Sequence, residues 1–198
     1  MNSLLLNVAL YLGLFAALLN LVRRQWTLNL IALVVQILCL FPMLDAILPI
    51  QLAVIQPFTG VMVTVILYLT LVSVGGIEPI NLRKKPTSGE VFRTLAGLLL
   101  LALLRAFIPN LQSEVFQGTP NQLLFFSMGL IVLGILQLGT IREPLYLAIG
   151  IFTFLSGFQL LYNALDYSFL LEALLVTLNL LLAIVGAFFI VKNAESEP

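Results

Sequence analysis

The chain has 198 residues, the size of one ordinary domain, yet only 9% of them are charged and 61% are hydrophobic. A soluble domain carries about 25% charged residues because its surface must meet water. The composition therefore excludes a soluble enzyme and a disordered chain. Nine basic residues balance nine acidic ones, which leaves no basic excess for binding nucleic acid. We expect an all-α integral membrane protein surrounded by a lipid bilayer.

The residue types that carry most metal and cofactor chemistry are scarce. The chain has no His and one Cys, Cys39, which lies in an apolar run and is expected to be a small packing residue. Zinc sites, haem ligation by His, Cys-ligated iron–sulfur clusters and His-based catalytic triads are excluded on these counts. We expect no cofactor, no metal ion and no catalytic residue in this chain, which by itself is not predicted to be an enzyme.

Seven stretches are long and apolar enough to cross roughly 30 Å of hydrocarbon at about 1.5 Å per residue. They are predicted near residues 4–22, 27–48, 51–75, 92–108, 121–140, 144–165 and 168–191. The apolar runs are continuous and do not alternate with polar residues, which argues against transmembrane strands. The sequence thus predicts about seven transmembrane helices.

Basic residues predict how these helices are oriented. The first span ends at Arg23 and Arg24 and has no basic residue before it, the reverse of a cleaved signal peptide. An outer N-terminus puts residues 23–25, 81–93, 141–143 and the C-terminal tail on one side, together with eight of the nine basic residues. The positive-inside rule then predicts an outer N-terminus and a cytoplasmic C-terminus, in a cell membrane or an energy-transducing inner membrane.

The basic residues of these segments have a second possible role. They are expected to hold the orientation by contacting anionic headgroups, and docking of a cytoplasmic partner is the alternative. The residues concerned are Arg23, Arg24, Arg83, Lys84, Lys85 and Arg142.

The chain contains a weak internal repeat. In residues 4–75 and again in residues 121–191, a helix ends at a short Arg-bearing turn, a second helix starts at once and a third returns. This pattern predicts two parallel three-helix units, joined by a linking helix at 92–108, within one membrane domain covering residues 1–198. A chance likeness between two apolar hairpins is the alternative.

The segment VLGILQLGTIREPLYLAIG, with the two helices after it, resembles the K-type small membrane subunit of respiratory complex I. Relatives of that family include the C subunit of multisubunit sodium/proton antiporters and the hydrogenase-4 component E family. Component E proteins are similar to the whole chain in length and number of spans, and the stretch from Arg23 to Gln36 looks like their early Arg-turn helix. The resemblance implies an accessory subunit of a complex I-like, hydrogenase-like or antiporter complex. Its partners would be antiporter-like and connecting subunits, and any redox cofactors would lie in other subunits.

The chain departs from this pattern at the acidic positions. K-type subunits have an intramembrane Glu shortly after an Ile-Gly pair, whereas here Gly150 is followed by Ile151 and Phe152. In the run LLEALLVTLN, Glu172 matches the first acidic position of the component E family and Asn179 occupies the second. An amide cannot gain and lose a proton at useful pH. The resemblance therefore implies a mainly structural subunit that lacks most of the family's proton-relay carboxylates.

Polar side chains inside the spans are the remaining candidates for a site. Interhelical hydrogen bonds are their first interpretation, and a proton or ion path is the alternative. The candidates are Glu172, Asn179, Gln36, Gln56, Thr59 and Gln159.

A proline predicts a weak point in the third span. Pro57 has no amide hydrogen for the carbonyl of Ala53, and Gly60 follows one turn later. This is either a simple kink or a functional helix break of the kind that forms sites in transporters. The alternative function is accordingly a small stand-alone transporter with a parallel helical repeat and a site near Gln56, Thr59 and Gln159.

Overall fold

The computed structural model describes residues 3–75, 87–114, 116, 118–166 and 168–196. All regular structure in these residues is helical, which confirms the predicted all-α class. The helices are α1 (Ser3–Val22), α2 (Trp26–Asp45), α3 (Ile50–Ala53), α4 (Ile55–Ser73), α5 (Ser88–Glu114), α6 (Asn121–Thr140), α7 (Pro144–Leu165) and α8 (Phe169–Ser196).

Seven spans are long and apolar enough to cross a membrane within the described part of the chain, with α3 and α4 together forming the third. Their number agrees with the prediction, and two of them extend beyond the predicted ends. α5 starts at Ser88 instead of residue 92, because the Glu90 carboxylate accepts the backbone N–H of Thr87 at 3.0 Å and so caps the first turn. α8 continues to Ser196 as a helix after its apolar stretch has ended. Hydropathy marks the membrane-embedded part of a helix, not its polar ends.

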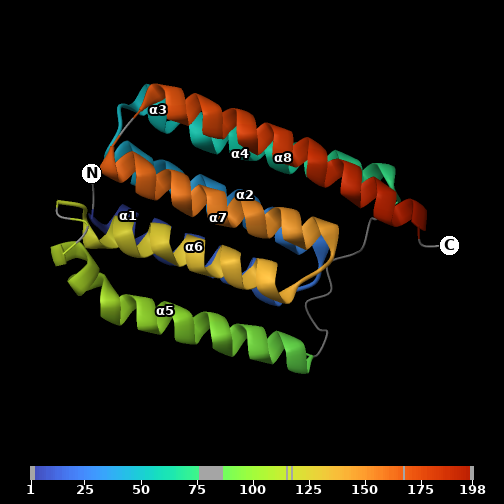
Figure 1. Cartoon of the computed structure of the whole chain (residues 1–198), viewed down its shortest axis with the longest axis horizontal. Coiled ribbons are helices and arrows are strands. Elements are labelled where there is room, and N and C mark those ends of the chain that lie inside the picture. The colour runs from blue at the N-terminus through green and yellow to red at the C-terminus, as the bar shows by residue number, and fades with distance from the viewer. Residues whose placement is uncertain (1–2, 76–86, 115, 117, 167, 197–198) are drawn as a thin grey trace.

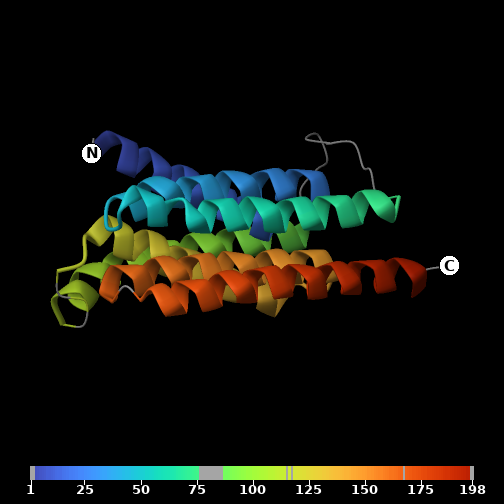
Figure 2. The ribbon, with the colours of Figure 1, turned by 90° about the horizontal axis from the view of Figure 1, so that it is seen from above.

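The helices form two layers of three, with α5 at one edge (Figures 1 and 2). One layer contains α1, α2 and α4, and the other contains α6, α7 and α8. Across the layers α1 packs on α6, α2 on α7 and α4 on α8, while α5 contacts α1 and α6. The first, second and third helix of one layer, counted along the chain, therefore face the first, second and third helix of the other.

The two layers are also matched along the chain. Adding 118 to the first and last residue numbers of α1 gives those of α6. Adding 118 to the number of the first residue of α2 likewise gives the first residue of α7. Both hairpin turns consequently have three residues, 23–25 and 141–143. The division into two three-helix units and the duplication of one ancestral unit stay predictions.

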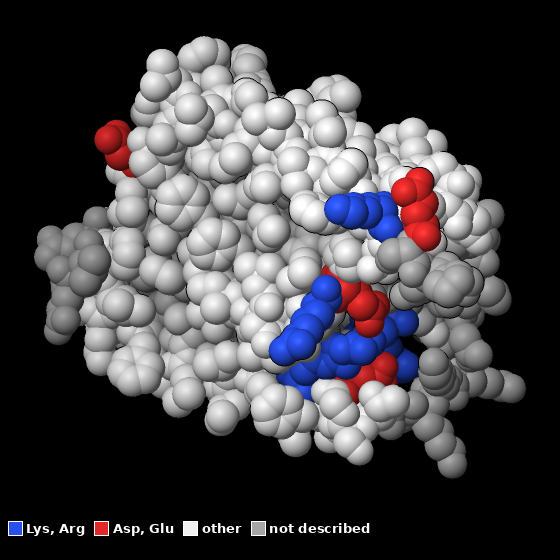
Figure 3. Space-filling model, turned by 45° about the vertical axis from the view of Figure 1, so that its right-hand side comes forward, with Lys and Arg blue, Asp and Glu red and all other residues white. Residues whose placement is uncertain are grey.

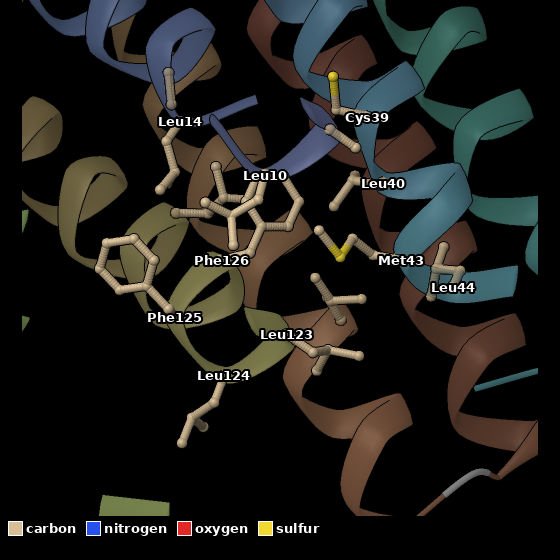
Figure 4. Packing of buried hydrophobic residues seen from close by; sticks show 14 of the residues in the cluster. Leu10, Leu14, Cys39, Leu40, Met43, Leu44, Leu123, Leu124, Phe125 and Phe126 are labelled. Carbon is tan, nitrogen blue, oxygen red and sulfur yellow. The ribbon is translucent and has the colours of Figure 1, made fainter. Parts of the chain in front are cut away.

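Two apolar clusters fill the space between the layers. The first joins α1, α2 and α6 through side chains such as Leu10, Met43 and Phe126, and it also contains buried Cys39 (Figure 4). The second joins α2, α4, α7 and α8 through residues such as Leu33, Leu67 and Ile149. The layers thus share their cores, and neither three-helix unit buries its apolar face alone.

Candidate intramembrane site

Three amide side chains from three helices meet inside the bundle. Gln159 on α7 accepts two hydrogen bonds at Oε1, from Gln56 Nε2 on α4 at 2.9 Å and from Asn179 Nδ2 on α8 at 3.3 Å. Gln56 and Gln159 are buried, and Asn179 is partly buried. We call these three residues the amide cluster. Three of the six polar candidates named from the sequence are therefore in direct contact.

Glu172 forms a second polar pair beside the amide cluster. Asn163 Nδ2 on α7 donates to Glu172 Oε2 on α8 at 3.0 Å, and both side chains are buried. Asn163 follows Gln159 by four residues, so it lies on the same face of α7, about 6 Å further along the helix. Asn163 was not among the sequence candidates, although its four-residue spacing from Gln159 is a signal that could have identified it.

The other two polar candidates lie apart from the amide cluster. Gln36 on α2 accepts a hydrogen bond at Oε1 from Thr153 on α7, at 3.4 Å, and both residues are fully buried. Thr59 is also buried, but its hydroxyl donates to the backbone carbonyl of Ile55 on the preceding turn, at 2.8 Å. Gln36 therefore bonds α2 to α7, and Thr59 bonds to its own helix.

The amide cluster and the Asn163–Glu172 pair both contain polar atoms that make no hydrogen bond to the described residues. Gln56 Oε1, Gln159 Nε2 and Asn163 Oδ1 are buried and have no hydrogen-bond partner among the described residues. A buried amide without a full set of partners costs free energy, of the order of 1–3 kcal/mol per group in protein mutational data. Each of these atoms can still bond one further polar group.

Pro57 lies in the first turn of α4, three residues after the interruption at Val54 that separates α3 from α4. Val54 keeps right-handed helical angles (φ −78°, ψ −25°), and the Phe58 N–H still donates to the Val54 carbonyl at 3.1 Å. The backbone thus continues as a helix that lacks the bond from residue 57. Gly60 faces α2, because a Cβ atom there would lie 2.7 Å from the Ile37 side chain. This geometry favours a kink over an open, ligand-binding break.

Figure 3 shows basic side chains gathered at one end of the bundle with acidic side chains beside them, and a separate acidic group far from them. At the basic end Arg24 Nη1 pairs with Glu143 Oε1 at 3.3 Å, so the turn of the first hairpin is bonded to the turn of the second. Arg142 belongs to the same second turn, and Arg23 precedes Arg24. The remaining basic candidates, Arg83, Lys84 and Lys85, lie outside the described residues.

With seven apolar spans in its described residues and polar side chains that bond one helix to another, the fold defines this chain as an integral membrane protein. Within the described residues, no group of three or more His, Cys, Asp or Glu side chains could hold a metal ion. Comparisons with protein-family models, with curated proteins and with solved structures found no match for the chain.

Proposed function

We propose that this chain is an accessory membrane subunit of a multisubunit ion-translocating complex, of the complex I-like, membrane-bound hydrogenase-like or antiporter kind, and that its part in the complex is structural. The observation that supports this most is the pairing of the intramembrane polar groups with one another. Gln159 bonds three helices together, and Gln36 bonds two. Side chains used in this way hold a bundle together.

The small number of buried titratable side chains among the described residues supports the same proposal. Glu172 is the one carboxylate among the buried side chains of the described residues. A proton relay needs several groups that can gain and lose a proton across a hydrocarbon layer about 30 Å thick. The hydrogen-bond partner of Glu172, Asn163, is an amide, and so are Gln159 and Asn179 further along α7 and α8, and amides cannot serve. Proton translocation would therefore run through a neighbouring subunit.

The proposed orientation puts the N-terminus outside and the C-terminus in the cytoplasm. Its support is the distribution of charge, because Arg23, Arg24, Arg93, Arg142 and Lys192 all belong to the end of the bundle that holds the two hairpin turns. The membrane would be a cell membrane or an energy-transducing inner membrane.

Copurification tests the assignment to a complex. An affinity-tagged chain extracted from its native membrane in mild detergent is expected to migrate with much larger membrane proteins, identifiable by mass spectrometry as antiporter-like and connecting subunits. A stable monomer or homodimer that carries out transport alone would contradict the proposal.

A variant at Glu172 tests the structural role within the assembled complex. Glu172→Gln keeps an oxygen acceptor for Asn163 Nδ2 and removes the titratable proton. Ion translocation by the complex is expected to be unchanged. Its loss, in a complex that assembles in normal amount, would show that Glu172 carries protons.

The unused capacity of the amide cluster favours one second candidate, a small stand-alone transporter. Gln56 Oε1 and Gln159 Nε2 are buried and can each bond one more polar group, such as a solute in transit. Proteoliposomes that contain this chain alone would then show sodium or proton flux. That flux would disappear in Gln159→Leu and persist in Thr177→Ala, an exposed position whose hydroxyl bonds only to its own helix. The accessory-subunit proposal expects no flux from the chain alone.

A further inference from the structure

A small polar cavity lies at the basic end of the bundle, where the turn between α1 and α2 meets the first turn of α5. Its volume is about 240 Å³. Every described residue that lines it is polar, charged or glycine, in contrast to the lipid-facing sides of the same helices. The lining residues are Arg23, Arg24, Gln25, Thr87, Gly89, Glu90 and Arg93.

Arg93 is the unusual member of this lining. Its side chain is only 5% exposed, although arginine is among the residues most rarely buried without a partner. Nε donates to the Gly89 carbonyl at 3.1 Å, whereas Nη1 is buried and has no hydrogen-bond partner among the described residues. A buried cationic donor without a partner is costly, and an anion in the cavity would remove that cost.

The start of α5 adds a second attraction for an anion. The first backbone N–H groups of a helix have no partner within the helix, and its N-terminal end carries a partial positive charge. Gly89, the second residue of α5, leaves this backbone uncovered. A Cβ atom placed on Gly89 would meet nothing closer than Arg93 Nη2, at 4.0 Å.

The charges around the cavity are predominantly positive. Among the described residues, three guanidinium groups line it, from Arg23, Arg24 and Arg93, against one carboxylate, that of Glu90. That carboxylate already accepts the Thr87 backbone N–H at 3.0 Å. Arg24 is paired with Glu143 outside the lining, but both partners are about half exposed, so this pair is weak. The balance therefore favours an anion over a cation.

We propose that this cavity binds a phosphate-type oxyanion, held by Arg93 Nη1, the neighbouring guanidinium groups and the backbone N–H groups at the start of α5. Planar guanidinium groups and helix N-termini are the common protein donors to phosphate oxygens. The cavity lies at the end of the spans, where phospholipid headgroups are found. The same chemistry is offered by a headgroup phosphate and by free phosphate in solution.

The test uses the full-length protein with two probes, one for each source. In the first arm, native mass spectrometry compares how well phosphatidic acid and phosphatidylcholine are retained. In the second arm, inorganic phosphate is titrated into protein in phosphatidylcholine nanodiscs while its thermal unfolding is followed. We expect either an affinity for phosphatidic acid about tenfold above that for phosphatidylcholine, or a saturable rise in unfolding temperature with phosphate.

Two variants separate this cavity from general surface charge. Gly89→Asp places a carboxylate in the cavity at a helical position where an acidic residue is favourable, so the fold is retained and anion binding is expected to fall at least about tenfold. Arg142→Gln, the control, removes one positive charge from the same end of the bundle outside the cavity lining, and is expected to change binding by less than about twofold.

A third variant tests the sign of the electrostatic effect. Glu90→Gln keeps an acceptor for the Thr87 N–H and removes the negative charge of Glu90 from the lining, so anion affinity is expected to rise. A response to phosphatidic acid alone would identify a lipid headgroup, and a response to inorganic phosphate would identify a free anion. The proposal would be overturned by an absence of binding in both arms, or by equal losses in Gly89→Asp and Arg142→Gln.

Discussion

Gln159 connects three helices, because its side-chain oxygen accepts hydrogen bonds from Gln56 on α4 and Asn179 on α8. In a bilayer, an unpaired amide has no water to bond, so the three side chains stabilise one another only while the helices stay together. Amides at this depth therefore specify which faces of α4, α7 and α8 meet. The hydrogen bond between Asn163 and Glu172 likewise specifies which faces of α7 and α8 meet, further along the contact between these two helices.

Replacing Gln159 is expected to loosen this contact. Gln159→Leu leaves the donors of Gln56 and Asn179 without their acceptor, at a cost of about 1–3 kcal/mol in the free energy of unfolding. Reversible unfolding in mixed micelles measures this difference. Thr177→Val, at an exposed position on α8, is the control and is expected to stay within about 0.5 kcal/mol of the wild type. Equal stability of the two variants would show that the amide cluster does not hold the helices.

Substitutions at Glu172 distinguish its hydrogen bond from its charge. Glu172→Leu removes the acceptor for Asn163 Nδ2 and is expected to lower the free energy of unfolding by about 1–3 kcal/mol. Glu172→Gln keeps an oxygen in that place and is expected to lose less than half as much. Equal losses in the Gln and Leu variants, measured in the same micelles, would mean that the carboxylate charge, which both variants lack, stabilises the fold more than the hydrogen-bond acceptor does.

At the scale of helices, α6 and α7 form the closest pair through two glycines. A Cβ atom on Gly134 would lie 2.6 Å from the backbone nitrogen of Phe154, and one on Gly157 would lie 2.6 Å from the carbonyl oxygen of Ser127. Both of these neighbouring atoms belong to the backbone, so they cannot move away by a change of rotamer as a flexible side chain can. Small residues allow helix backbones in a membrane to approach in this way, where van der Waals packing supplies much of the association energy.

A matched pair of alanine variants tests this contact. Gly157→Ala is expected to force α6 and α7 apart and to cost about 1–3 kcal/mol through overpacking. Gly139→Ala, on α6, meets nothing within 4 Å and is expected to leave the stability unchanged or to raise it by up to about 1 kcal/mol through helix propensity. Thermal unfolding in one detergent compares the two. An equal effect of both substitutions would indicate that propensity, not contact, determines the result.

At the scale of the whole molecule, the two three-helix layers are joined by shared apolar clusters and by a bond between their turns. Arg24 and Glu143 connect the hairpins at the basic end, while Gln122 Nε2 on α6 donates to Asn7 Oδ1 on α1 at 2.8 Å near the other end. Corresponding helices in the two layers run in the same direction. In the proposed orientation, both hairpin turns therefore face the cytoplasm.

Cysteine labelling tests this orientation in intact cells. Asn110→Cys, exposed near the far end of α5, is expected to react with a membrane-impermeant maleimide added outside. Glu195→Cys, exposed at the end of α8, is expected to react only after the cells are opened. Native Cys39 is buried, so its background labelling is expected to be low. The reverse pattern would place the N-terminus in the cytoplasm.

The sequence located most of the polar groups in the membrane but not their partners. Glu172 and Asn179 were found because polar residues stand out in an apolar run, and Gln56 and Gln159 for the same reason. Residue type alone could not show that Gln159 bonds both α4 and α8, since that depends on how α7 is rotated. From the sequence, Arg93 was only a charge on one side of the membrane. Its burial arises because the turn between α1 and α2 lies beside the start of α5, and that placement is a property of the tertiary structure.

The sequence by itself determined the class, the seven spans and their approximate ends. These follow from local properties, because the free energy of putting a helix into hydrocarbon depends mainly on its own length and composition. Only the tertiary structure decided which helices face one another. Apolar side chains gain as much from lipid as from a neighbouring helix, so the choice depends on glycines such as Gly157, on paired amides such as Gln159 and on the shapes of the facing surfaces. Those contacts join residues on different helices, such as Gln56 and Gln159, which are 103 positions apart, and no local pattern in the chain records them.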